Sequence, residues 1–348
     1  MADSFSLDLF DYELPRERIA QHPLPERDAA RLLVLDRRGG PDRHSRVREL
    51  SRWLRAGDLL VGNASWVRPA RLRGRKASGG AAQALILGAL RDAPGRYRAL
   101  VKCTGRLREG QKFRFPAPEG APIEAELAAL GEGGEVTLAF PPGVSPYSVG
   151  EMPLPPYIRR KRPDPRDRER YQTVFACEPG SVAAPTAGLH LTGPLLRDLR
   201  ARGISWAEVI LHVGPGTFRP LRAEDLDAGS LPPEEFDLPA VTAEAVARTR
   251  ADGGRIVAVG TTTTRVLESC ACEDGRVRPA RGETDLFVRP GHLFRVVDAL
   301  LTNFHLPRSS LLLMVAAFAG RERILAAYAE AIEEGYRFYS YGDAMLIL

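Results

Sequence analysis

Apolar and polar residues alternate along the chain in two different rhythms, which predict two kinds of structure. In the first 60 residues, and again from residue 194, apolar runs short enough for buried strands are separated by stretches with the three-to-four spacing of helices. This alternation is typical of an α/β sheet with crossover connections. The expected elements are strand 32–35, helix 50–54, strand 58–61, helix 194–201, strand 204–213, helix 243–251, strand 255–259, strand 296–304 and helices 309–319 and 322–335.

Between residues 67 and 140 the apolar runs become shorter and are separated by Gly, Pro, Asp or Glu. Six of them have the length and spacing of antiparallel strands, which predicts a small barrel or sandwich. The runs are ARLRGR, QALILGAL, RYRALVKC, QKFRF, IEAELAAL and EVTLAF. IEAELAAL also fits a helix, so the number of strands stays open. We predict an inserted β-domain at 67–149 and a discontinuous α/β domain formed by 1–66 and 150–348.

Residues 141–170 are rich first in proline and then in arginine, which is typical of an extended linker or flap that leads back to the first domain. The charged run 159–170 has two interpretations. It can be a solvated surface segment. With Tyr157 beside it, it can also bind a phosphate backbone and stack a base.

Length and composition narrow the class of protein. The 348 residues suffice for two domains, and 49 Lys and Arg against 44 Asp and Glu give a net charge of +5, which permits a nucleic-acid partner without requiring one. We find no apolar run long enough for a membrane span and no signal-peptide pattern, so we expect a soluble, cytoplasmic protein. The four cysteines are too few for a disulfide framework. Cys270 and Cys272 lack a second pair, so no metal site is expected.

The segment 170–192, RYQTVFACEPGSVAAPTAGLHLT, follows neither rhythm and consists largely of small residues around Gly180, Pro185 and His190. Small side chains let a ligand approach the backbone closely, and Gly and Pro fix the backbone angles that such an approach needs. Thr192 fits the N-cap of the following helix, where backbone donors suit an anionic group. The segment is therefore either a ligand-binding loop or a tight turn between a strand and a helix.

Three further turns follow expected strands, at the edge of an α/β sheet where ligands bind. Their sequences are LHVGPGTFRP, which contains His212, VGTTTTRVLES, which contains Arg265, and TNFHLPRSS, which contains His305. Each has a structural explanation, because a histidine at a strand end is often structural and threonines can bond their own helix backbone. Together they predict a sizeable polar pocket. The sequence lacks a Rossmann fingerprint, a P-loop, a GxSxG elbow and an HExxH motif.

These segments resemble the family of S-adenosylmethionine:tRNA ribosyltransferase-isomerases of queuosine biosynthesis. The resemblance extends nearly from end to end, and long ordered blocks are far more specific than short motifs. Besides the turns above, its blocks include FDYELPRERIAQHPLPERDAARLLVLDR, MPLPPYIRR, TDLFVRPGHLFRVVDALLTNFHLP and YRFYSYGDAMLI. The resemblance implies an α/β domain interrupted by a small antiparallel β-barrel, which agrees with the insert expected from the pattern.

The resemblance also implies a reaction. The ribosyl part of S-adenosylmethionine is transferred and isomerised onto 7-aminomethyl-7-deazaguanine at the wobble position of tRNA. Epoxyqueuosine is formed, and adenine and methionine are released. S-adenosylmethionine would be a consumed substrate, so no cofactor is expected. The implied partners are this tRNA and S-adenosylmethionine. From the sequence we expect no membrane association and a monomer, although the sequence carries no direct signal of the oligomeric state.

Such a reaction needs a general base, an acid for the departing adenine, and polar groups for the ribose and the methionine. The acid–base candidates are His190, His212 and His305, because histidine titrates near neutrality, and they stay unranked. Asp285 and Asp343 are candidates to hold a ribose hydroxyl or orient a histidine.

Other residues are expected to contact the substrates. Arg265 would bind the methionine carboxylate through its two parallel N–H donors, helped by hydroxyl groups of the threonine run. The further substrate-binding candidates are Thr186, Gly188, Gly214, Gly216, Thr217, Thr262, Thr263 and Asn303. The candidates for contact with tRNA phosphates and bases are Tyr157, Arg159, Arg160 and Lys161.

Two departures from the family pattern bear on activity. The family commonly has Asp or Asn, then Thr and Arg, where this chain has Ala64, Ser65 and Trp66, and a frequent histidine is replaced by Pro232. If the family's residues at these positions bind an anionic substrate, other residues such as Arg68 bind it in this chain. Two alternatives therefore stay open: a tRNA-binding relative without catalysis, and a nucleosidase that acts on S-adenosylmethionine without tRNA.

Overall fold

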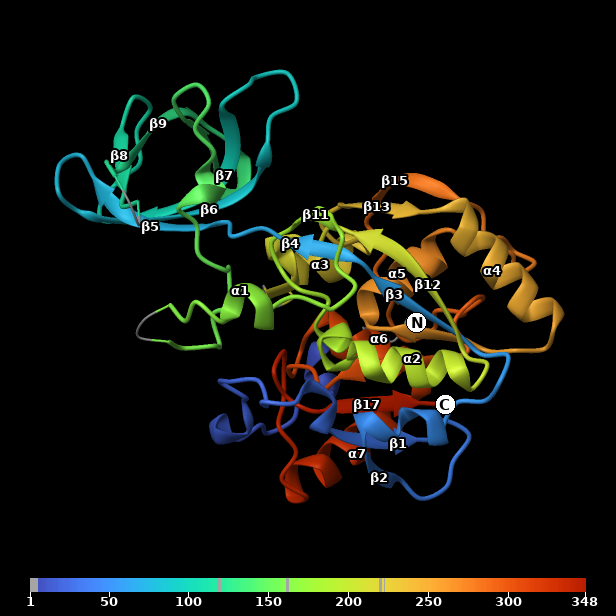
Figure 1. The fold of residues 1–348 in the computed structure, drawn as a ribbon. Coiled ribbons are helices and arrows are strands. Elements are labelled where there is room, and N and C mark those ends of the chain that lie inside the picture. The colour runs from blue at the N-terminus through green and yellow to red at the C-terminus, as the bar shows by residue number, and fades with distance from the viewer. Residues whose placement is uncertain (1–5, 118–119, 161–162, 219–220, 222) are drawn as a thin grey trace.

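The computed structural model describes residues 6–117, 120–160, 163–218, 221 and 223–348, which form a layered α/β body and a closed β-barrel (Figure 1). The α/β body contains a nine-stranded sheet with the strand order β15-β13-β12-β3-β14-β16-β17-β1-β2. Its strands are β1 (Arg31–Leu35), β2 (Arg43–Arg46), β3 (Leu59–Asn63), β12 (Ser205–Leu211), β13 (Glu234–Leu238), β14 (Ile256–Val259), β15 (Ala280–Thr284), β16 (Ala299–Asn303) and β17 (Ala344–Ile347). The predicted strands of the α/β body are confirmed.

The middle of the sheet is parallel. β12, β3, β14 and β16 run in the same direction, whereas β17 pairs antiparallel with β16. The carboxyl ends of the four parallel strands therefore meet at one edge. Because ligands in α/β sheets bind outside that edge, the topology brings the predicted turns to the place where a site is expected.

Alternate residues of the central strands pack on opposite faces of the sheet. Leu59 and Val61 of β3 join a core with four helices, α4 (Ala240–Ala251), α5 (Thr261–Ser269), α6 (Ser310–Ala319) and α7 (Arg321–Glu333). Leu60 joins a second core on the other face, with α2 (Gly193–Ala201) and the 3₁₀ helix Val47–Arg52. The α-helices of the described residues also include the short α1 (Asp167–Arg170) and α3 (Ala223–Ala228). The helix expected at 50–54 is thus a 3₁₀ helix that begins earlier.

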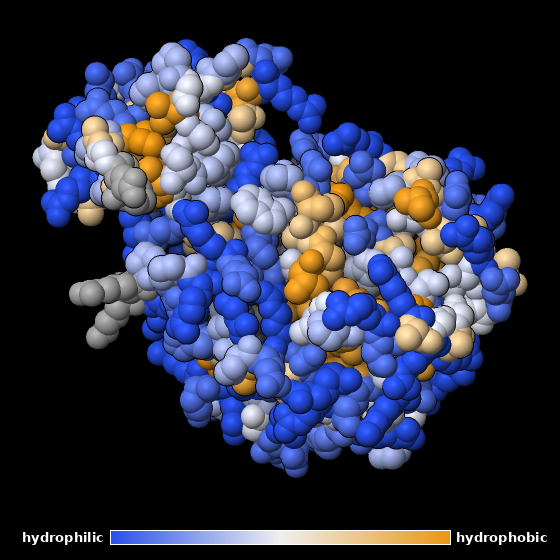
Figure 2. All heavy atoms as spheres, in the orientation of Figure 1, coloured by the Kyte–Doolittle hydropathy of each residue, from blue (hydrophilic) through white to orange (hydrophobic). Residues whose placement is uncertain are grey.

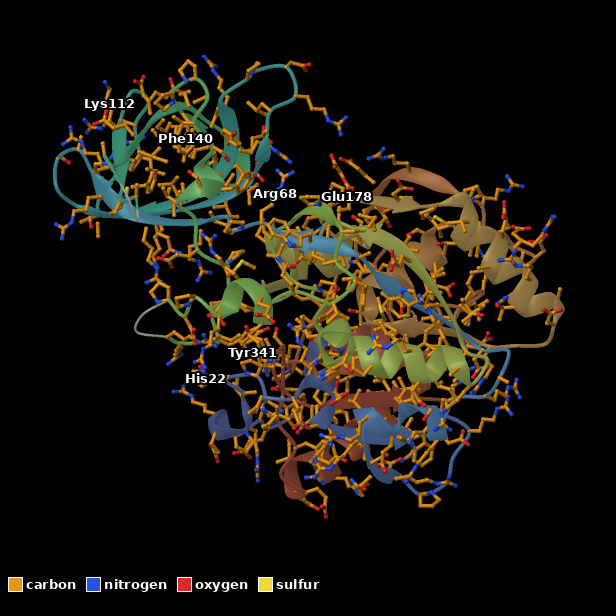
Figure 3. The ribbon with its side chains drawn as sticks, viewed as in Figure 1. His22, Arg68, Lys112, Phe140, Glu178 and Tyr341 are labelled. Atoms are coloured by element: carbon orange, nitrogen blue, oxygen red, sulfur yellow. The ribbon has the colours of Figure 1, made fainter. Side chains whose placement is uncertain are left out.

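All six predicted strands of the insert form one closed antiparallel barrel, with the order β10-β7-β6-β5-β8-β9. The strands are β5 (Arg71–Lys76), β6 (Ala81–Ala89), β7 (Arg96–Cys103), β8 (Lys112–Phe115), β9 (Ile123–Leu130) and β10 (Glu135–Ala139). The segment IEAELAAL is strand β9, because its alternating burial fits a strand with one face inward. Phe113, Phe115 and Leu127 fill the interior. In Figure 3 the labelled Phe140 lies in the barrel interior and Lys112 on the outside.

Two chain segments connect the barrel to the α/β body, and they are hydrogen-bonded to each other. The backbone N–H groups of Arg71 and Glu151 each donate to the other's carbonyl, at 3.1 and 2.8 Å. A Cβ atom on Gly150 would lie 1.6 Å from the carbonyl oxygen of Pro69, so only glycine permits this approach. The connection is therefore a close-packed pair of strands, and the domain boundaries at 66/67 and 149/150 stay a prediction.

In the arginine-rich segment 159–170, Arg168 and Arg170 form hydrogen bonds with backbone carbonyls of other segments. Arg170 donates to the backbone carbonyls of Leu24 and Pro25, and Arg168 donates to that of Gly150 at 3.1 Å. These bonds tie the N-terminal segment and the barrel connection to α1. Arg170 is thus half-buried and held by backbone contacts, whereas Arg168 is exposed, as the interpretation of a solvated surface segment expects. Among the helices of the described residues, none combines the length and apolar character that a membrane span requires.

Candidate active site

A small cavity of about 80 Å³ lies where the parallel strands β14 and β16 end. It is lined by Tyr157, Ala183, Ala184, Pro185, Thr186, Ala187, Val213, Gly260, Thr261, Thr262, Thr302, Asn303, Phe304, His305, Leu306, Ser309, Leu311, Tyr339 and Ser340. Residues of all four predicted turns therefore meet here, the fourth turn through Val213, as expected from the sheet topology. The segment 170–192 contains strand β11 (Glu178–Ser181) and the 3₁₀ helix Thr186–His190, and α2 begins directly after it. Thr192 caps α2, because its hydroxyl accepts from the N–H of Leu195 at 3.2 Å.

A large cavity of about 810 Å³ lies between the α/β body and the barrel. Its α/β side includes Gly214 and Gly216 of the fourth turn, and its barrel side includes Arg98 and Leu100 of β7. Arg68, which lines it, lies beside the junction of the two parts (Figure 3). Both cavities are lined by Val213 and Leu311, so they adjoin each other.

Asn303, at the end of β16, connects its own turn with the segment 186–190 and with Tyr339. Its side-chain oxygen accepts from the Thr186 hydroxyl at 2.7 Å, and its Nδ2 donates to His190 Nε2 at 3.1 Å and to the carbonyl of Tyr339 at 3.3 Å. Because His190 Nε2 accepts this bond, its proton is on Nδ1. His190 lies behind Asn303 and does not line either cavity.

Burial controls the protonation of the two buried histidines. It lowers the pKa of His190 to about 4, although the carboxylate of Asp343 acts in the opposite direction. Burial also lowers the pKa of His305 to about 3. His305 lines the small cavity, and its Nε2 lies 2.8 Å from the Thr302 hydroxyl. Both rings are therefore neutral near pH 7 and can accept a proton, but neither supplies one as an imidazolium.

Two buried hydroxyl groups of the small cavity have no partner among the described residues. These are Thr262 Oγ1, in the first turn of α5, and the hydroxyl of Tyr339. Tyr339 has a positive φ of 72°, an uncommon backbone state for a residue with a bulky side chain. An unpaired buried hydroxyl costs free energy, so a polar ligand at this position would satisfy both groups. Sequence reasoning missed Tyr339; its only signal was the aromatic block YRFYSYGD.

Thr263 does not take part in the small cavity. Its hydroxyl donates to the carbonyl of Val259 at 2.9 Å, and that of Thr264 donates to Gly260 at 3.2 Å. The predicted role of Thr263 as a substrate donor is therefore wrong. The bonding of helix threonines to their own backbone, which the sequence left open, applies to these two residues.

His212 belongs to the large cavity, not to the small one. Burial lowers the pKa of His212, and its Nδ1 is buried without a hydrogen-bond partner in the described part of the chain. The ring packs on Gly180, where a Cβ atom would lie 2.3 Å from Nδ1. The three histidines therefore occupy three different positions: lining the small cavity, behind it, and in the large cavity.

Replacing Gly180 by alanine is expected to displace the His212 ring and to lower the free energy of unfolding by about 1–3 kcal/mol, because the site is already close-packed. Urea unfolding of the variant gives this difference. Gly79→Ala is not a matched control because its φ is positive, whereas Gly88→Ala is suitable, since no atom lies within 4 Å of the added Cβ. Equal stability of the two variants would contradict the packing argument.

Arg265 is bound by the protein itself, which corrects its predicted role. Its guanidinium forms an ion pair with Glu234 and donates to the carbonyls of Thr284, at 3.2 Å, and Leu286, at 3.1 Å. Glu234 also accepts from the N–H of Gly214 at 2.7 Å. Although Arg265 lines the large cavity, its donors are committed to these partners. We therefore no longer assign it to the methionine carboxylate.

Neither of the two candidate aspartates, Asp285 and Asp343, lines the small or the large cavity. Asp343 is 2% exposed and accepts from the backbone N–H groups of Arg31 and Arg337, at 3.0 and 2.8 Å. It influences His190 only through its charge. Asp285 is exposed and lines neither cavity. The predicted ribose contacts by these aspartates are not supported by their positions.

Two further substrate-binding candidates are Gly188 and Thr217. A Cβ atom on Gly188 would lie 2.8 Å from the ring of Phe175 and 2.9 Å from Thr173, so this glycine serves packing and does not approach a ligand. Thr217 belongs to the 3₁₀ helix Pro215–Phe218, but its side chain lies outside the described residues.

The tRNA candidates are dispersed. Tyr157 lines the small cavity, with its ring 4.3 Å from that of Tyr339 and its hydroxyl 2.6 Å from Ser340. Arg160 forms ion pairs with two aspartates of the same segment and is 10% exposed, so it is not free to bind a phosphate. Arg159 is exposed, and Lys161 lies outside the described residues.

Stability is expected to fall as the pH decreases from about 6.5 to about 4. His190 and His305 are neutral in the folded protein down to about pH 4, whereas in the unfolded chain they bind protons below about pH 6.5. Protons therefore favour unfolding in this window. Thermal unfolding at pH 7 and pH 5, for the wild type and for His190→Gln, measures the effect. The same loss of melting temperature in both proteins would contradict it.

The geometry defines a class of protein: an α/β enzyme with a ligand site at the carboxyl edge of its sheet and a β-barrel beside the entrance.

Residues 7–347 match the family model described as "Queuosine biosynthesis protein". The chain is 50% identical to an S-adenosylmethionine:tRNA ribosyltransferase-isomerase of a Methylobacterium species, over 98% of each chain. It is 51% identical to the protein of that name from Acidithiobacillus ferrooxidans, over 97% of this chain and 96% of the relative. The crystal structure of S-adenosylmethionine tRNA ribosyltransferase from Thermotoga maritima is similar, with a TM-score of 0.55, 37% identity and coverage of 98% of this chain and 100% of that one. The chain belongs to the queuosine biosynthesis family of S-adenosylmethionine:tRNA ribosyltransferase-isomerases.

Proposed function

We propose that the two adjoining cavities are the active site of an S-adenosylmethionine:tRNA ribosyltransferase-isomerase. The enzyme transfers and isomerises the ribosyl moiety of S-adenosylmethionine onto 7-aminomethyl-7-deazaguanine at the wobble position of tRNA. Epoxyqueuosine-tRNA is formed, and adenine and methionine leave. S-adenosylmethionine is consumed, and no cofactor takes part. We further propose that the protein is a cytoplasmic monomer, which size-exclusion chromatography with light scattering can test for the oligomeric state.

The observation that carries this proposal is the pair of buried, unpartnered hydroxyls in the small cavity, Thr262 Oγ1 in the first turn of α5 and the hydroxyl of Tyr339. The small cavity is too small for a whole nucleoside but has room for a carboxylate, whereas the volume of the large cavity lies in the range of small-molecule sites. Backbone N–H groups at a helix N-terminus favour an anion. The methionine carboxylate would therefore bind at Gly260–Thr262, with the Thr262 hydroxyl as a further donor. The nucleoside would extend into the large cavity.

The chemistry follows from the charge of the sulfonium. It acidifies the adjacent C5′ protons, so that a base can form an ylide, which opens the ribose and expels adenine. The aminomethyl nitrogen then attacks, and methionine leaves. Of the three candidate histidines, His305 is the one that lines the small cavity, so we assign it as the base on its position. Thr302, 2.8 Å from His305 Nε2, would orient the ring.

One assay separates this function from its alternatives. The protein is incubated with S-adenosylmethionine, with and without tRNA that carries the aminomethyl-deazaguanine base, and free adenine and the modified nucleoside are measured by mass spectrometry. We expect adenine and epoxyqueuosine only with the tRNA. Adenine without tRNA would indicate a nucleosidase. Binding of the tRNA without any adenine would indicate a relative that has lost catalysis.

A further inference from the structure

The barrel carries the charge asymmetry of this protein. From residue 71 to 139 the sequence has twelve Lys and Arg against seven Asp and Glu, so this segment accounts for the whole net charge of +5. The asymmetry is concentrated in β5 to β7 and the loop after β7. Residues 71–108 contain ten Lys and Arg but one acidic residue, Asp92. Hydrophilic residues accordingly dominate the outer rim of the barrel in Figure 2.

Neighbouring strands place these charges on one surface. β7, β6 and β5 are adjacent in the barrel, and Lys102 of β7 is paired in register with Gln83, which pairs with Arg73 of β5. Arg98 and Lys102 are exposed and lie four residues apart on the same side of β7, about 13 Å along the strand. We define the basic face as Arg75, Arg96, Arg98, Lys102 and Arg106.

The basic face has no internal neutralisation. In the described residues, no carboxylate lies within ion-pair distance of any of its five side chains. Arg75 lies directly opposite Arg114 across the β5–β8 pair, and Arg114 is itself paired with Glu124 at 2.8 Å. The five side chains of the basic face, which form no such ion pair, are suited to a polyanion outside the barrel.

The position of the basic face relates it to the active site. Its member Arg98 lines the large cavity, together with Arg68 and Arg91 and with the carboxylates Glu132 and Glu135, whereas the other four members lie outside the lining of this cavity. The barrel interior is filled by side chains such as Phe113 and Leu127, so its outer surface is the part that can bind a partner. A nucleotide inserted into the large cavity would leave its flanking strand beside the basic face.

From these observations we infer that the basic face of the barrel binds the phosphate backbone of the substrate tRNA, outside the nucleotide that is modified. This inference rests on the proposed function. The barrel would thus contribute affinity for the tRNA and little to the chemistry at the sulfonium. Phosphate contacts of this kind are salt-dependent and do not depend on sequence.

The test compares two variants with the same change of charge. The barrel variant is Arg75→Gln/Lys102→Gln/Arg106→Gln. The control variant, Arg200→Gln/Arg248→Gln/Arg278→Gln, removes three exposed arginines of the α/β body. Binding of a fluorescein-labelled tRNA transcript is measured by anisotropy between about 50 and 200 mM salt. Kinetics are measured with S-adenosylmethionine and the modified tRNA.

We expect the barrel variant to bind the tRNA about 10- to 100-fold more weakly than wild type and the slope of log K against log salt to decrease by about three. The KM for tRNA should rise, with kcat and the KM for S-adenosylmethionine unchanged, while the control variant should resemble wild type. Equal affinities and slopes for the two variants would overturn the inference. If the triple barrel variant does not fold, Lys102→Gln alone should lower the slope by about one, and an unchanged slope would overturn the inference equally. A wild type that binds tRNA but transfers no ribosyl group would refute the proposed function and not the basic face.

Discussion

Replacing His305 by alanine is expected to lower the rate of adenine release by about 10²- to 10⁴-fold, the usual contribution of a general base. The reason is its position. His305 lines the small cavity beside the first turn of α5 and is oriented by Thr302. Single-turnover kinetics with the modified tRNA measure the chemical step separately from product release.

Two further variants make this prediction specific. His305→Gln keeps an amide that can bond Thr302, so its fold should be preserved while the base is lost, and its rate should fall as in the alanine variant. His22→Ala is the matched control, because His22 is exposed and lines neither cavity. If both His305 variants remain folded and release adenine within about threefold of the wild-type rate, the base is another residue.

Replacing Glu234 by alanine is expected to lower the free energy of unfolding by about 3–5 kcal/mol, because it leaves the guanidinium of Arg265 buried without its counter-ion. Arg265 is 6% exposed and Glu234 is 8% exposed. The substitution also removes the acceptor of the Gly214 N–H. Chemical denaturation with urea, followed by tryptophan fluorescence, gives the value.

Two further variants, Glu235→Ala and Glu234→Leu/Arg265→Met, test whether the loss of stability comes from the ion pair. Glu235→Ala, on the same strand but exposed, should change the free energy of unfolding by no more than about 0.5 kcal/mol. Glu234→Leu/Arg265→Met should be more stable than Glu234→Ala, because no uncompensated charge stays buried. A double variant as unstable as Glu234→Ala would show that the loss comes from other contacts. Activity should fall as well, since Arg265 anchors the helix whose first turn lines the small cavity.

Local sequence determined the secondary structure of this protein to a large extent. Alternating apolar positions marked strands such as β5 to β10, and Thr192 marked the start of α2 through its side-chain cap. These features depend on residues a few positions apart, so the chain itself contains the information. IEAELAAL was ambiguous, because an eight-residue run with small residues fits a helix as well as a strand until the barrel buries one side of it.

The sequence also identified which turns to inspect, since the edge of an α/β sheet is a general ligand site. It could not rank the residues within them. Thr262 and Thr263 are adjacent and chemically the same, yet one hydroxyl lines the small cavity and the other bonds Val259. A helix turns by about 100° per residue, so neighbours point in different directions, and only the placement of α5 decides which one meets the ligand.

The same limit applies to the charged residues. An arginine in a glycine- and threonine-rich turn fits a substrate carboxylate, but Arg265 meets Glu234, which is 31 positions away in sequence. His190 and His305 are both followed by leucine, and only the fold places one behind Asn303 and the other at the cavity. The sequence by itself determined the order of helices and strands, the inserted barrel and the turns that form the site. The tertiary structure decided which side chains face the ligand and which are bound by the protein, because burial and long-range partners depend on contacts that the local pattern does not contain.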